Sequence, residues 1–220
     1  MKTKKNMDIR FKNCINKFND IILTELYEKE IKCWIAGGSV RDYFMGVPVK
    51  TDIDLFFPDL VNYNKAAKYF KDNDAEIKWE SENGMKVLYK KKTFDLVKIY
   101  FKNPKETINN FDFTVAMFAV DKDNVYYDDM SFVDLSKRQL MINKITYPES
   151  TTSRMNRYIR KGFYICNGEL YKIIQSIGKK YVEEHENNKN NIEDVEQISE
   201  ELKEKNITSF DLASVFFGMD

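Results

Sequence analysis

Residues 33–57 place two glycines and two aspartates in one short stretch, CWIAGGSVRDYFMGVPVKTDIDLFF. The run CWIA predicts a strand that ends at the glycines, and a helix is expected to begin directly after them. The run TDIDLFF predicts a second strand. Because side chains alternate between the two faces of a strand, Asp52 and Asp54 should lie on the same face. Their like charges would repel each other in apolar surroundings, so the pattern favours a bound cation.

Each of these motifs also has a plain structural interpretation when it is taken alone. A D-x-D pair occurs at solvated strand ends, and a glycine pair serves any tight turn between a strand and a helix. Combined, Gly37, Gly38 and Ser39 would present backbone N–H groups at a helix start, which suits a triphosphate. Asp95, in the apolar run KTFDLVKIYF, is the candidate for a third carboxylate, and its other interpretation is a strand residue that faces solvent. Carboxylates of this kind hold the two Mg²⁺ ions, about 3.5–4 Å apart, that clamp many phosphoryl transfers.

The composition narrows the class of protein. The chain has 220 residues, of which 43% are hydrophobic and 32% are charged, as in globular proteins. Thirty-five basic residues balance thirty-five acidic ones, so contact with nucleic acid would depend on a local basic patch. Three scattered cysteines and one histidine predict free thiols and no zinc site. Because no signal peptide and no long apolar run are found, a cytoplasmic location without membrane contact is expected.

Strand and helix patterns are mixed up to residue 147, and only helical patterns follow. The predicted fold class is α+β, with a mixed-sheet head over 1–147 and a small all-helical part over 148–220. The expected helices cover 8–31, 40–46, 61–74, 104–111, 132–140, 150–163, 169–186, 192–205 and 209–219. The expected strands cover 33–38, 51–57, 75–81, 85–91, 93–101, 113–120 and 124–129.

The motifs together resemble the polymerase-beta nucleotidyltransferase superfamily. More narrowly, they resemble the head domain shared by class II CCA-adding enzymes and bacterial poly(A) polymerases, whose pattern is G-G-x-V-R-D-x-L-x-G followed by D-x-D. The segments FDFTVAMFAVD (111–121), FVDLSKRQL (132–140) and RMNRYIRKGF (154–163) are similar to later motifs of that head and its neck helix. The resemblance implies a nucleotidyltransferase head followed by a neck-like domain.

The resemblance also implies transfer of a nucleoside monophosphate from an NTP, ATP or CTP, to an RNA 3′ hydroxyl, with tRNA as the first expected acceptor. Asp52, Asp54 and Asp95 would be the catalytic residues and would bind two Mg²⁺ ions, or Mn²⁺ in their place. The residues implied to bind the nucleotide are Gly37, Gly38, Ser39, Arg41, Asp112, Arg154 and Arg157. Arg41 has the alternative of a salt bridge with a nearby acid. Arg154 and Arg157 share a basic helix face that could hold phosphate or simply be solvated.

Several positions depart from the family pattern. Asn110 and Phe111 replace two arginines, Ala116 replaces an asparagine, and the neck motif E-D-x-x-R has no clean counterpart. The stretch after the head is also shorter than the family's tRNA-gripping domains. Three functions therefore stay open: transfer to an RNA 3′ end, transfer to a hydroxyl of a protein or small molecule, and a non-catalytic module that binds nucleotide or RNA. The oligomeric state stays open as well.

Overall fold

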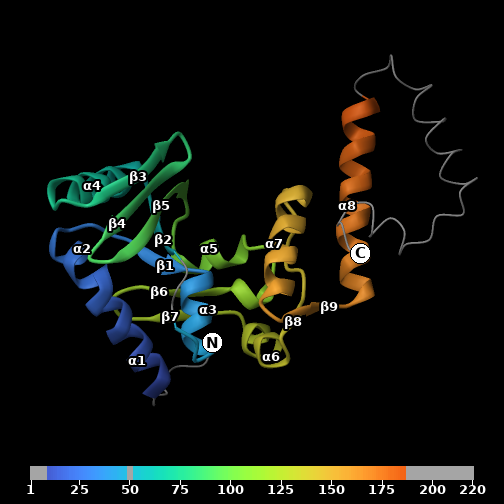
Figure 1. Ribbon diagram of the computed structural model, residues 1–220, viewed down its shortest axis with the longest axis horizontal. Coiled ribbons are helices and arrows are strands. Elements are labelled where there is room, and N and C mark those ends of the chain that lie inside the picture. Colours follow the sequence, from blue (N-terminus) through green and yellow to red (C-terminus); the bar gives the residue numbers. More distant parts are fainter. Residues whose placement is uncertain (1–8, 49–51, 187–220) are drawn as a thin grey trace, which may run out of the picture. The chain divides into compact units, whose positions relative to one another are not determined.

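The computed structural model describes residues 9–48 and 52–186. The chain divides into two compact units after Tyr171, and the candidate site lies wholly in the first (Figure 1). Only residues 172–186 of the second unit are described, and they are helical. The helices expected over 192–205 and 209–219 lie outside the described residues.

One mixed sheet organises the first unit. Its strand order in the described residues is β3-β4-β5-β2-β1-β6-β7, where β2 and β5 are parallel and the other neighbours are antiparallel. The strands are β1 (Trp34–Ala36), β2 (Ile53–Phe57), β3 (Glu76–Ser81), β4 (Gly84–Tyr89), β5 (Lys92–Tyr100), β6 (Phe118–Val120) and β7 (Val125–Tyr127).

Helices and helical turns lie around this sheet. They are α1 (Ile9–Phe18), the π-helical turn η1 (Asn19–Leu23), α2 (Thr24–Glu28), α3 (Gly38–Phe44), α4 (Leu60–Asp72), α5 (Pro104–Asn109), the 3₁₀ turn η2 (Thr114–Ala116), α6 (Asp129–Lys137), α7 (Pro148–Arg160) and α8 (Asn167–Glu186). Local sequence accounts for several helix starts. Asp59 and Asn103 cap α4 and α5 by accepting hydrogen bonds from the backbone N–H groups three residues on. Among the described residues, no helix combines the length and apolar character needed to cross a membrane.

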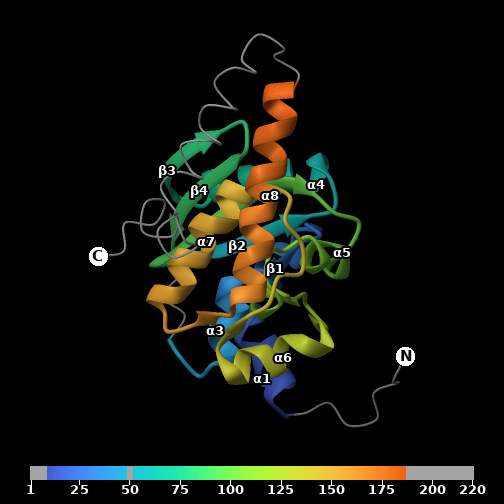
Figure 2. The same cartoon turned by 90° about the vertical axis from the view of Figure 1, so that its right-hand side faces the viewer.

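The two faces of the central strands have different surroundings. On one face α4 packs closely, with the ring of Phe70 centred 5.4 Å from that of Phe94 on β5. On the other face α5 covers one end, where Ile108 packs in a buried cluster with Phe56 of β2. Asp54 is two residues before Phe56 and therefore shares its face, beyond the part that this cluster fills. Figure 2 views the molecule from the side of α5 and α7.

The predicted fold class is confirmed, and three details differ from the expected elements. The helix expected over 8–31 contains the π-helical turn η1 and ends at Glu28. The strand expected over 113–120 is reduced to β6, because Thr114 begins a 3₁₀ turn and hydrogen-bonds to Asp134 at 2.7 Å.

The third difference lies in the part that was expected to be all helical. Tyr164–Ile165 forms a short strand, β9, which pairs in parallel with β8 (Gln139–Leu140). Left-handed backbone at Arg138 and Gly162 ends α6 and the turn after α7, so that both segments can run side by side. The domain boundary at 147 stays a prediction.

Candidate active site

Asp54 and Asp95 are direct neighbours in the sheet. They are register partners across the parallel pair of β2 and β5, so their side chains leave the same face of adjacent strands. Burial, followed by the charges of Asp95 and Asp52, raises the pKa of Asp54 to about 7. Burial also raises the pKa of Asp95, against the opposing charge of Lys86. Within the described part of the chain, Oδ1 of Asp95 is buried and has no hydrogen-bond partner.

Lys86 joins two of the three acids and was not singled out from the sequence. It lies on β4 directly opposite Asp95. Its Nζ is 2.7 Å from Oδ2 of Asp52 and 3.3 Å from Oδ2 of Asp95. The hydrogen bond to Asp52 raises the pKa of Lys86. The only local signal was a lysine among apolar residues in MKVLYKK, and its partners could not be read from that run.

A metal centre formed by three acids is not present in this arrangement. In residues 9–48 and 52–186, no three Asp, Glu, His or Cys side chains are placed together so that they could hold a metal ion. Asp52 lies just before β2, and its carboxylate contacts Lys86. Metal ligation by Asp52, Asp54 and Asp95 therefore stays a prediction, which is taken up below.

The glycine turn lies against the acid pair. Gly37 has φ +86°, a conformation that glycine adopts easily and other residues rarely do. A Cβ atom at this position would lie 3.8 Å from Oδ2 of Asp54 and 3.7 Å from the ring of Phe111. Gly38 begins α3, and Ser39 follows it. Ser39 is fully buried, and its Oγ has no hydrogen-bond partner among the described residues. The turn thus offers free backbone and hydroxyl donors close to Asp54.

Arg41 makes structural contacts in this structure. It is 2% exposed, and its Nε and Nη2 atoms donate to Oδ1 of Asp42 at 2.8 and 2.5 Å. Its guanidinium also lies 5.0 Å from the ring centre of Tyr158 on α7. These contacts connect α3 with α7 and match the salt-bridge alternative for this residue.

The basic residues of α7 have two different neighbours. Arg154 forms an ion pair with Asp112, with 2.5 Å between Nη1 and Oδ2, so these two predicted nucleotide-binding residues are brought together. Arg157 lies near enough to Asp54 for its charge to lower the pKa of that carboxyl. The face of α7 therefore supplies positive charge beside the acids.

The positions that depart from the family pattern have defined environments. Phe111 is half-buried against the cluster around α5, and its ring centre is 6.0 Å from that of Phe56. The amide oxygen of Asn110 accepts a hydrogen bond from Lys144 at 2.8 Å. Ala116 lies nearly buried in the 3₁₀ turn. Of these three residues, Phe111 is the one that the Cβ position of Gly37 would contact.

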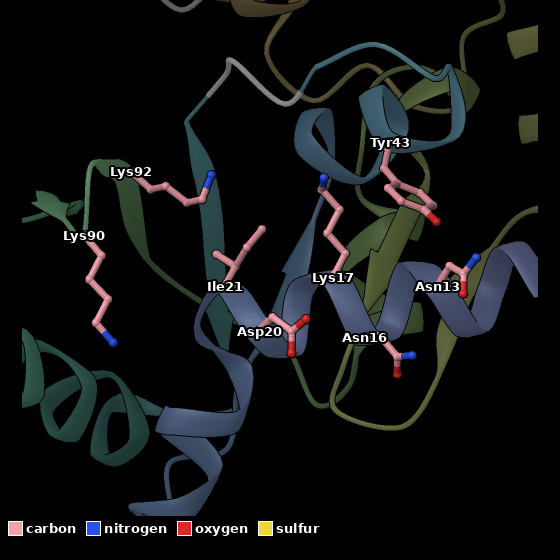
Figure 3. A pocket seen from close by; sticks show the side chains of 8 residues that line it. All are labelled: Asn13, Asn16, Lys17, Asp20, Ile21, Tyr43, Lys90 and Lys92. Carbon is pink, nitrogen blue, oxygen red and sulfur yellow. The ribbon is translucent and has the colours of Figure 1, made fainter.

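A separate pocket of about 690 Å³ is lined by none of the predicted site residues. It lies among α1, η1, α3 and the turn between β4 and β5 (Figure 3). Its lining residues are Asn13, Asn16, Lys17, Asp20, Ile21, Tyr43, Lys90 and Lys92.

Solved structures of CCA-adding enzymes share the fold of this chain. The Thermotoga maritima CCA-adding enzyme complexed with tRNA matches with a TM-score of 0.54 and 17% identity, over 77% of this chain and 42% of that one. The Bacillus stearothermophilus CCA-adding enzyme in complex with CTP matches with a TM-score of 0.54 and 19% identity, over 76% and 43%. A tRNA nucleotidyltransferase complexed with a primer tRNA and an incoming ATP analog matches with a TM-score of 0.52 and 16% identity, over 77% and 52%. The predicted resemblance is thus confirmed for the fold, and this chain spans about half or less of each of these proteins.

Comparison by sequence gives a more specific relation. No curated protein matches the chain in sequence. One family model does match it, over residues 9–138, which is more than half of the chain and includes Gly37, Asp54, Lys86 and Asp95. The chain therefore belongs to the Gabija anti-defense 2 (Gad2) protein family.

Proposed function

We propose that this protein is a metal-dependent nucleotidyltransferase that moves a nucleoside monophosphate from an NTP to a hydroxyl group. The observation that carries the proposal is the Asp54–Asp95 pair next to the glycine turn, where a Cβ at Gly37 would lie 3.8 Å from Oδ2 of Asp54. Carboxylates and phosphate-binding backbone meet there on one sheet face, which is the arrangement that phosphoryl transfer needs. The shared fold with nucleotidyltransferases supports the same reaction type.

The residues present fit a divalent cation. Asp52, Asp54 and Asp95 offer only oxygen ligands, which Mg²⁺ and Mn²⁺ accept. The buried, unpartnered Oδ1 of Asp95 and the raised pKa of Asp54 both indicate carboxylates that lack compensating charge. These three residues would hold two Mg²⁺ ions, or Mn²⁺, and the bound ions would neutralise charge on the phosphates.

The remaining residues would position the nucleotide. Backbone N–H groups at Gly37 and Gly38 and the hydroxyl of Ser39 would donate to the triphosphate. Arg157 would add positive charge near Asp54, and the ring of Phe111 would support the base. Asp95 would take the proton of the acceptor hydroxyl, whose oxygen forms a bond to the α-phosphorus while pyrophosphate leaves.

Two acceptors have support. The printed complexes of the structural neighbours with tRNA, CTP and an ATP analog favour an RNA 3′ end, tRNA first, with ATP or CTP as donor. The family name favours a second acceptor, a protein or small-molecule hydroxyl that belongs to the Gabija defense. Action in the cytoplasm and a functional boundary at residue 147 are part of the proposal.

Labelling separates these acceptors. The full chain is incubated with Mg²⁺, each α-labelled NTP in turn, and either total RNA or total protein from cells with and without Gabija. Label in RNA supports the first acceptor, and label in protein only from Gabija cells supports the second. The Asp54→Asn, Asp95→Asn double variant should transfer nothing. Absence of label in every pool, including small molecules, would contradict enzymatic function and leave the binding-module alternative.

A further inference from the structure

The edge strand β3 presents a tryptophan that the proposed reaction has not used. Every residue of β3 is exposed, and β3 has a strand neighbour only on the β4 side (Figure 1). Its two large apolar side chains, Ile77 and Trp79, are 43% and 44% exposed. In a regular strand, residues two apart would share one face.

A bulge in β3 separates these two side chains. Ile77 is opposite Val87 of β4, and the register then shifts, so that Trp79 is opposite Lys86. Val87 is buried and lies on the face that α4 covers, whereas Lys86 lies on the other face. Glu80, the next residue, again lies on the α4 face, because it forms an ion pair with Lys71 of α4. The bulge therefore directs Trp79 onto the face that carries the acids.

On that face, a straight row of register partners crosses four strands. Trp79 on β3 is opposite Lys86 on β4, Lys86 is opposite Asp95 on β5, and Asp95 is opposite Asp54 on β2. Two strand spacings, about 10 Å, separate the backbone of Trp79 from that of Asp95. The glycine turn with its predicted triphosphate lies at the Asp54 end of the row. Trp79 is thus at the opposite end, on the side of the acid proposed to activate the acceptor.

We infer that Trp79 is the stacking platform for the terminal base of a single-stranded nucleic-acid acceptor. The inference rests on the proposed function, because it places the acceptor hydroxyl at Asp95. A flat, exposed aromatic ring binds any base through its face, and a distance of about 10 Å suits one nucleotide between ring and hydroxyl. Stacking of this kind does not depend on base identity, so it fixes the position of the acceptor end and not its sequence.

Binding is tested without NTP, so that no transfer is required. Six-nucleotide RNA and DNA single strands, and a duplex of the same sequence, are titrated into the full chain while tryptophan fluorescence is recorded. The chain has two tryptophans, and Trp34 is 1% exposed, so a stacked base should quench mainly Trp79. Single strands should quench the signal and the duplex should not. Quenching by RNA alone or by DNA alone identifies the sugar that is accepted.

Variants then test the residue itself. Trp79→Ala should raise the Kd for a labelled single strand about fivefold or more, whereas Trp79→Phe should restore most of the affinity. Ile77→Ala is the matched control, since Ile77 is on the same strand and equally exposed but on the other face, and it should leave Kd unchanged. Thermal melts of each variant check that the fold is kept. Equal Kd for Trp79→Ala and the parent, or equal losses for Trp79→Ala and Ile77→Ala, would overturn the inference.

Transfer assays distinguish a failure of this inference from a failure of the proposed function. If the enzyme labels RNA, Trp79→Ala should raise KM for the acceptor while KM for the NTP stays within twofold. Transfer to a protein acceptor that Trp79→Ala does not slow would overturn the stacking role and leave the transferase intact. Trp79-dependent binding of single strands with no transfer from any NTP would do the reverse.

Discussion

Asp54 and Asp95 stand directly opposite each other across the parallel strands β2 and β5. Adjacent strands are about 4.8 Å apart, so two carboxylates at the same level must share their charge or find a cation. In this structure Lys86 compensates Asp95 and Asp52, while Asp54 has a pKa of about 7. The consequences of this arrangement can be measured without knowing the acceptor.

The stability of the metal-free protein should depend on Asp54 and on pH. The pKa of Asp54 rises from 3.8 to about 7 on folding, so its contribution to stability is full below about pH 4 and is lost as pH rises through about 7. Asp54→Asn removes this loss. In EDTA, the Tm of the variant minus that of the parent should grow between pH 4 and pH 7 and then level off. A variant no more stable than the parent at pH 8 would contradict the burial of this charge.

Catalysis should require Asp52 and Asp54 alike, although their effects on stability should differ. Changes to residues that only support metal ligands cost about 10–100-fold, so loss of a ligand should lower kcat/KM by more than about a hundredfold. Asp52→Ala should change metal-free stability by less than about 1 kcal/mol, because its ion pair with Lys86 is partly exposed. Asp72→Asn, which breaks an exposed pair with Lys68 on α4, is the control. Near-parent turnover by either site variant would rule out the metal assignment.

Lys86 should compete with the metal. Its ammonium contacts Oδ2 atoms of two predicted ligands, Asp52 and Asp95. Lys86→Met should lower Tm in EDTA, because two partly buried carboxylates lose their counter-charge, and should enlarge the rise in Tm on adding Mg²⁺. Lys71→Met serves as the control, since Lys71 pairs with Glu80 on the α4 face. The same Mg²⁺-dependent rise in Lys86→Met and the parent would show that Lys86 and the metal occupy different positions.

Gly37 should be needed for the nucleotide, and Gly46 provides a matched comparison. Both have positive φ, +86° and +68°, so alanine at either position should cost about 1–2 kcal/mol of stability. Only the Cβ at Gly37 would project toward Asp54 and Phe111, since the one at Gly46 would meet no atom within 4 Å. Gly37→Ala should therefore raise KM for the NTP about tenfold or more, and Gly46→Ala should not. Equal KM values in the two variants would place the triphosphate elsewhere.

Selection among nucleotides should be weak. Phe111 offers an aromatic face at the glycine turn, and Ala116 has no side-chain donor or acceptor, whereas strong selection needs hydrogen bonds to the base edge. The four NTPs should have kcat/KM values within about tenfold of each other, a difference below about 1.4 kcal/mol. Measurements with one acceptor decide this. A preference above a hundredfold would reveal base-reading residues other than these.

Local patterns in the sequence determined the kind of fold and most of its elements. The alternation in TDIDLFF and KTFDLVKIYF, the glycine turn before α3, and the caps of α4 and α5 depend on residues close together in the chain. For the same reason the nucleotidyltransferase-like head could be recognised from short motifs in order. Membership of the Gad2 family was not foreseen, because a family name is not contained in such motifs.

Only the tertiary structure decided which of these residues meet. The register of β5 against β2 places Asp95 beside Asp54, and that of β4 against β5 brings Lys86 to both Asp95 and Asp52. A bulge turns Trp79 to the same face, against the alternation that β3 would otherwise follow. Register and bulges are set by packing between strands far apart in the chain, and such packing leaves no periodic signal within any one strand.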